Sequence, residues 1–234
     1  MTRLEAIREF YSLLDELNRR VGGCRYLRLC NAKAGWPQRG VYFFLDEHEL
    51  RQSGSGPRVV RVGTHAVAST SRTTLWGRLA QHRGNLAGRS AGGGNHRGSI
   101  FRLHVGHAML AGGVDLGETA LNWGKDSSAA REVRDREYEL ERRVSAYIGA
   151  LPMLWLNVPD PPGPQSQRRF LERRSIALLS GLLDASPDPP SASWLGLRSV
   201  RREIRESGLW NLDHVSEQRN QDFLEPLAEA IRQV

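Results

Sequence analysis

Two apolar stretches, GVYFFL at residues 40–45 and RVVRVG at residues 58–63, decide the fold that this sequence predicts. Each is a short run of aliphatic, β-branched and aromatic residues, which is the composition of a strand that has little contact with water. The chain between them contains SGSGP at 53–57, a run of residues that favour turns. We therefore predict a hairpin of two antiparallel strands joined by a long loop.

Helical patterns lie on both sides of this hairpin. Residues 2–21 carry leucine, isoleucine and phenylalanine at helical spacing, and the pattern ends before the glycine pair at 22–23. A short helix over 75–84 can be capped by Thr74 or by the threonine before it. The remaining predicted elements are helices over 100–110, 131–148 and 167–183, a strand within 151–160, and two short helices around 197–206 and 220–232.

This order of elements predicts an α+β fold in which helices flank a small three-stranded sheet. We expect an N-terminal helix and lead-in over 1–35 and a main domain over 36–185. A helical insertion at about 111–148 interrupts the main domain, and a helical C-terminal tail follows over 186–234.

The composition indicates a basic protein without a membrane segment. The chain of 234 residues has a net charge of +7, and Lys33 and Lys125 are its only lysines. Arginine suits phosphate oxygens, although a GC-rich genome also produces this bias. The chain has no apolar run of about 18 residues and no secretory leader, so we expect a soluble cytoplasmic protein with reduced thiols at Cys24 and Cys30.

The helix LWGRLAQHRG (75–84) places Arg78 and His82 four residues apart, on one helical face. Leu75 and Leu79 form the apolar stripe beside them. Charged side chains on a helix usually form a solvated face, so this pair alone does not indicate a site.

Together with its surroundings, the pair resembles part of the GIY-YIG nuclease superfamily domain. GVY at 40–42 and RVG at 61–63 stand where that family has its two tripeptides, and Arg78 follows on the next helix. Glu172 stands on a helix after the third strand, at the family's metal-binding glutamate. The resemblance, which covers roughly 38–183, implies a three-stranded sheet and hydrolysis of nucleic acid with one divalent cation, Mg²⁺ or Mn²⁺.

The resemblance also implies a role for each of these residues. Tyr42 and His82 would activate the attacking water, Arg78 would stabilise the phosphate, and Glu172 would hold the cation. Two positions depart from the family pattern. Arg61 stands where the second tripeptide normally begins with tyrosine, and Asp184 stands near the place of the family's asparagine. Asn211 can replace that asparagine only if the tail folds back.

We expect the partner to be nucleic acid, DNA in the first place, and not a membrane. Candidate contacts with it are Arg61, His65 after the second strand, and Arg83 and Arg97, each of which has a glycine as a neighbour. The sequence does not specify an oligomeric state.

Other interpretations stay open at this point. Tyr42 can be a core aromatic residue, and Glu172 can pair with Arg168 or Arg169 one turn before it. The glutamates at 137, 139 and 141 are expected on the surface of a charged helix. The leading hypothesis is a DNA endonuclease, and the alternative is an inactive nucleic-acid-binding module that lost activity through Arg61.

Overall fold

A computed structural model describes residues 1–114, 116–117 and 122–234 of the chain. Its elements are α1 (Arg3–Arg20), β1 (Arg25–Tyr26), η1 (Leu27–Leu29), β2 (Gly40–Leu50), β3 (Pro57–Gly63), α2 (Leu75–Arg83), η2 (His96–Gly98), α3 (Ile100–Ala111), α5 (Arg131–Ala150), β4 (Pro152–Asn157), α6 (Gln167–Leu179), η3 (Leu195–Arg198), α7 (Arg202–Ser207) and α8 (Leu224–Arg232). Within these ranges, no helix combines the length and the apolar character that crossing a membrane requires.

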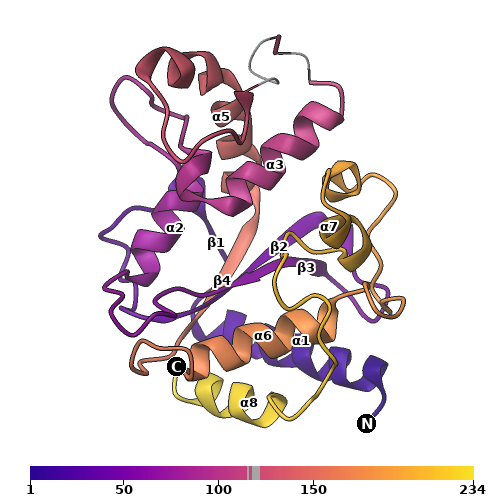
Figure 1. The fold of residues 1–234 in the computed structure, drawn as a ribbon. Coiled ribbons are helices and arrows are strands. Elements are labelled where there is room, and N and C mark those ends of the chain that lie inside the picture. The colour runs from indigo at the N-terminus through magenta and orange to yellow at the C-terminus, as the bar shows by residue number, and fades with distance from the viewer. Residues whose placement is uncertain (115, 118–121) are drawn as a thin grey trace.

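The described strands form one antiparallel sheet in the order β1-β4-β2-β3 (Figure 1). This arrangement confirms the α+β class and the predicted hairpin, which is β2 and β3. The sheet has one strand more than predicted, because β1 pairs at the edge of β4. Its two residues are too few to show the alternating pattern by which a strand is found in a sequence.

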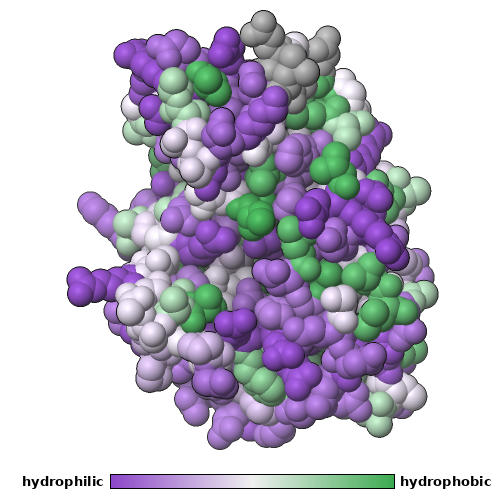
Figure 2. Space-filling model, in the orientation of Figure 1, coloured by the Kyte–Doolittle hydropathy of each residue, from purple (hydrophilic) through white to green (hydrophobic). Residues whose placement is uncertain are grey.

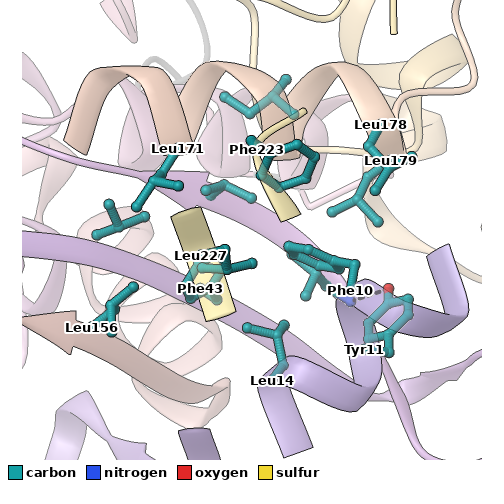
Figure 3. Close-up of a cluster of buried hydrophobic side chains, with 14 of the residues drawn as sticks. Phe10, Tyr11, Leu14, Phe43, Leu156, Leu171, Leu178, Leu179, Phe223 and Leu227 are labelled. Carbon is teal, nitrogen blue, oxygen red and sulfur yellow. Dashed lines mark hydrogen bonds between the residues drawn. The ribbon is translucent and has the colours of Figure 1, made fainter. Parts of the chain in front are cut away.

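Helices cover both faces of the sheet, so its central strand β2 has side chains in two separate cores. Val41 and Phe43 point toward α1, α6 and α8, and Figure 3 shows Phe43 among the leucines and aromatic rings of that core. Tyr42 and Phe44 point to the other face, where α2, α3 and α5 pack. This alternation explains why GVYFFL is apolar at nearly every position.

The two ends of the chain belong to the same core. The Phe10 ring on α1 lies 6.0 Å from the Phe43 ring and 6.2 Å from the Phe223 ring of the tail, measured between centroids. Nε of Arg3 donates to the carbonyl oxygen of Leu178 at 3.2 Å. The tail therefore folds back over the sheet, and its path brings residues 209–214 to the edge strand β3.

One prediction for α5 is wrong, because two of the three glutamates that were expected on its surface are buried. Glu137 and Glu141 are 2% and 3% exposed, whereas Glu139 is on the surface as expected. Glu141 forms an ion pair with Arg102 of α3, and both oxygens of Glu137 accept from Arg97 at 2.7 Å. Arg97 and Arg102 therefore pack against this face of α5.

The predicted insertion is described only in part, since residues 115 and 118–121 lie outside the described ranges.

Candidate active site

The two tripeptides lie side by side in the sheet, where Tyr42 of β2 pairs with Gly63 of β3. A β-carbon on residue 63 would lie 2.6 Å from Cε2 of the Tyr42 ring and would overlap its hydroxyl oxygen. A β-carbon on residue 40 would overlap the carbonyl oxygen of Leu156 on β4. Close packing therefore requires glycine at both positions, and Gly63 leaves the space that the Tyr42 ring occupies.

Tyr42 is the first member of a buried chain of hydrogen bonds. Its hydroxyl is bonded to Nε2 of His82 at 2.8 Å, and Nδ1 of His82 is bonded to Oγ of Ser99 at 2.7 Å. Ser99 also caps the N-terminus of α3 by accepting from the amide of Arg102, as Thr74 caps α2. Both capped helices therefore fix the position of the His82 ring.

His82 lies behind Tyr42 and is fully buried. Burial, together with the positive charges of Arg78, Arg61 and Arg102, holds the pKa of His82 well below its ordinary value. The imidazole is therefore neutral near pH 7, with one N–H and one acceptor nitrogen. It reaches the solvent side of the site only through the hydroxyl of Tyr42.

Glu172 on α6 faces the end of β3. Its Oε1 accepts the amide of Thr64 at 3.0 Å, and Oε2 accepts no hydrogen bond from a residue that the structure describes. Burial raises the pKa of Glu172, although the charge of Arg61 opposes this shift. Three of the four arginines of α6 are paired elsewhere: Arg168 with Asp160, Arg173 with Glu217 and Arg174 with Asp222. The fourth, Arg169, lines the cavity, and its charge helps to oppose the rise in the pKa of Glu172.

A cavity of about 540 Å³ lies between the end of the hairpin, α2, α6 and the tail. The predicted residues Tyr42, Arg61, His65, Arg78 and Glu172 all line it. The face in Figure 2 is mostly hydrophilic, with hydrophobic residues gathered near its middle. The fold thus brings together side chains that are far apart in the sequence.

Arg78 reaches the cavity from α2 and is half-buried. Its NH1 donates to Oε1 of Gln81 at 2.9 Å and to the carbonyl oxygen of Gly98 at 3.3 Å. Within the described ranges, its Nε and NH2 donate to no residue. They can therefore meet an anion in the cavity, and the two existing bonds hold the guanidinium in place for it.

Arg61 and His65 both line the cavity, but each side chain is already hydrogen-bonded to a backbone carbonyl oxygen, which the sequence did not indicate. NH1 of Arg61 donates to the carbonyl oxygen of Trp210 at 2.5 Å, and the guanidinium is 7% exposed. His65 Nε2 is bonded to the carbonyl oxygen of Gln38 at 3.2 Å, so that nitrogen carries the hydrogen. Burial, followed by the charge of Arg168, lowers the pKa of His65 to about 4. Its other nitrogen, Nδ1, is buried and has no hydrogen-bond partner among the described residues, so His65 presents no N–H to a phosphate in the cavity.

The two remaining candidates lie outside this cavity. NH1 of Arg83 donates to the carbonyl oxygen of Cys30 at 2.7 Å, and its guanidinium lies 4.9 Å from the centre of the Trp76 ring. Arg97 is held by both oxygens of Glu137 and is largely buried. Arg83 is partly exposed and can contact a nucleic acid, whereas the side chain of Arg97 is only 6% exposed.

The lining residues that were not among the predicted site residues include His104, Asn211 and His214. His104 is 4% exposed, and neither of its ring nitrogens has a hydrogen-bond partner in the part of the chain that the structure describes. Burial, followed by the charge of His107, lowers the pKa of His104 to about 4. Asn211 and His214 come from the tail, and only its folded path brings them here.

The donor set at Glu172 fits a cation that is held mainly by water and substrate. No cluster of three or more histidine, cysteine, aspartate or glutamate side chains arranged for a metal occurs among the described residues. Mg²⁺ commonly uses one or two carboxylates, keeps several waters and takes its other ligands from phosphates. A carboxylate that lines a cavity and has one oxygen without a hydrogen bond from the described residues suits that mode of binding.

A family model described as the GIY-YIG domain matches residues 1–234. No curated protein matches the chain, and no solved structure matches it either.

Proposed function

This chain belongs to the GIY-YIG domain family, and on that premise we propose that it is an endonuclease that hydrolyses phosphodiester bonds in DNA with one divalent cation, Mg²⁺ or Mn²⁺. The carboxylate of Glu172 carries the proposal. It is partly buried at a cavity and, among the described residues, one of its oxygens accepts no hydrogen bond and no arginine forms an ion pair with it. A negative group in this position needs a positive partner, and a bound cation supplies it.

Arg78 would hold the phosphate. Its free N–H groups lie at the same cavity as Glu172, and charge-assisted bonds to phosphoryl oxygens strengthen as negative charge develops in the transition state. When bound, the cation neutralises charge on the phosphoryl oxygens and on the departing 3′ oxygen. Arg78 and Glu172 therefore act on the same group from different elements, α2 and α6.

Tyr42 and His82 would activate the water. When Nδ1–H of His82 donates to Ser99, its Nε2 accepts the Tyr42 hydroxyl, and the phenol oxygen can accept a proton from water as it passes its own to His82. In the free protein, positive charges nearby oppose protonation of His82. A bound phosphate offsets that field, so substrate binding makes His82 a better base.

The alternative is a nucleic-acid-binding module of the same fold without activity. Arg61 supports it, because an arginine cannot serve as a base near neutral pH at the place of the second tyrosine. The choice between the two proposals depends on whether Tyr42 and His82 can activate the water without a second tyrosine.

Glu172→Gln separates them, since it keeps the shape of the side chain and removes its charge. Wild-type and variant protein would be incubated with supercoiled plasmid and with branched duplexes, in Mg²⁺, Mn²⁺ or chelator. We expect the variant to lose cation-dependent cleavage by about 10²-fold or more. Binding of uncut DNA should stay the same or tighten, because one negative charge has left the cavity.

Glu229→Gln is the matched control, since Glu229 is an exposed glutamate on α8 that does not line the cavity. It should cleave like the wild type. Full cleavage by Glu172→Gln would refute the role of Glu172. A wild-type protein that binds DNA and cleaves no substrate under any condition would favour the inactive module.

A further inference from the structure

Residues 210–214 of the tail form one wall of the cavity, and the segment 209–217 that contains them is fixed to the hairpin at its start. Arg61 donates to the carbonyl oxygen of Trp210 at 2.5 Å. The next residue, Asn211, pairs with the backbone of Val62 twice, accepting its N–H at 3.1 Å and donating to its carbonyl oxygen at 2.8 Å. The side chain at the head of the second tripeptide is thus used to hold the tail against β3.

The other end of the segment is fixed to α6. Glu217 forms an ion pair with Arg173, the residue directly after Glu172. Partial burial raises the pKa of Glu217, but its bonds to Arg173 and His214 lower it further, so that the net pKa is below the ordinary value. Glu217 is therefore a carboxylate near pH 7 and accepts hydrogen bonds only.

His214 lies between these two anchors. Its Nδ1 is 2.6 Å from Oε1 of Glu217, so Nδ1 must carry a hydrogen. Its backbone has φ of 67°, a left-handed conformation that costs a residue with a β-carbon free energy and is often found at functional sites. Nε2 bonds to no residue within the described ranges, and the side chain lines the same cavity as Glu172.

Building on the proposed hydrolysis, we propose that His214 is its general acid, which donates the Nε2 proton to the departing 3′ oxygen. The water oxygen forms the new bond to phosphorus, its proton passes to Tyr42, the bond between phosphorus and the 3′ oxygen breaks, and that oxygen takes the proton of His214. Glu217 is the positioning residue, because its carboxylate accepts the Nδ1 hydrogen and fixes the orientation of the ring.

This assignment fills a role that the other cavity residues leave open. His65 and His104 are neutral near pH 7 because their pKa values are lowered to about 4, and His82 lies behind Tyr42. The ionisable groups that share the cavity wall with His214 include Asp213 on the tail, Arg169 and Glu172 on α6, Arg61 on β3, Arg78 on α2 and His104 on α3. Glu217, which is bonded to His214, is paired with Arg173 of α6.

The test compares two DNA substrates that differ only in the departing atom. One has the natural 3′ oxygen, and the other has a 3′ sulfur, whose thiolate leaves without a proton. Both are cleaved in Mn²⁺. His214→Ala should lower kcat about 10²-fold or more on the oxygen substrate and change it little on the sulfur substrate. Glu217→Gln should show the same preference with a smaller loss.

Two controls separate this result from a structural effect. His48→Ala removes an exposed histidine on β2 and should match the wild type on both substrates. Arg78→Ala should be slow on both, because it acts on the phosphate and not on the departing atom. An equal loss by His214→Ala on both substrates, or no loss on either, would overturn the assignment alone. A wild-type protein that cleaves neither substrate would overturn the proposed hydrolysis and this assignment with it.

Discussion

Replacing Gly63 by alanine should distort the candidate site by adding one methyl group. The new β-carbon would lie 2.6 Å from Cε2 of Tyr42 and would overlap the hydroxyl oxygen of the same ring. The ring has little room to move, because it is 1% exposed, is bonded to His82 at 2.8 Å and packs on Phe44 with centroids 5.7 Å apart. The overlap must therefore be relieved by shifting the ring or the strand.

The expected loss of unfolding free energy combines two destabilising contributions and one stabilising contribution. Overpacking a well-packed core costs about 1–3 kcal/mol of unfolding free energy, and losing the hydrogen bond between Tyr42 and His82 costs about 1 kcal/mol more. Alanine also reduces the conformational entropy of the unfolded chain relative to glycine, which stabilises the folded protein by about 0.4–1 kcal/mol. The net loss is about 2 kcal/mol, which lowers the unfolding temperature of a chain of this size by about 4–8 °C.

Thermal unfolding of Gly63→Ala measures this directly, with Gly54→Ala as the matched control. A β-carbon on residue 54 meets no atom within 4 Å, so the control should be as stable as the wild type or slightly more. The same Gly63→Ala change in a Tyr42→Leu background should cost much less, because the ring atoms that it overlaps are gone. Equal costs in the two backgrounds would refute the steric argument.

Two further predictions concern the tail and the buried histidines. Asn211→Ala leaves the N–H and the carbonyl oxygen of Val62 without partners in a buried place, which should cost about 2–4 kcal/mol and lower the unfolding temperature by about 5–10 °C, whereas the exposed Asn220→Ala should change it little. For His65 and His104, the folded pKa is about 4 and the ordinary value is 6.5, so the unfolded chain binds protons first as the pH falls. Stability should therefore be complete above about pH 6.5 and decline toward pH 4. His104→Leu should reduce that decline by about 2–3 kcal/mol in unfolding experiments across this range, and an unchanged decline would contradict the pKa assignment.

The structural features that depend on neighbours along the chain could be predicted from the sequence alone. The apolar composition of two runs and the turn residues between them predicted the hairpin of β2 and β3. Thr74, one of the two threonines predicted as the cap of α2, accepts the amide of Gly77. The spacing of Arg78 and His82 placed them one turn apart. These features follow from local periodicity and local hydrogen bonds, which any folded context preserves.

Only the tertiary structure decided which charged groups meet. The sequence offered Arg168 and Arg169 as partners for Glu172 one turn away, but Arg168 pairs with Asp160, and Glu172 faces the cavity. The sequence predicted Glu141 on the surface, but in the structure it forms an ion pair with Arg102 of α3.

The tail is the clearest case of what the sequence left open. Arg61 holds it at Trp210, and this contact brings His214 into a cavity with residues more than a hundred positions earlier. Such pairings depend on the path of the chain in the folded protein and on which partner best compensates a buried charge. The spacing of residues along the sequence specifies neither of these.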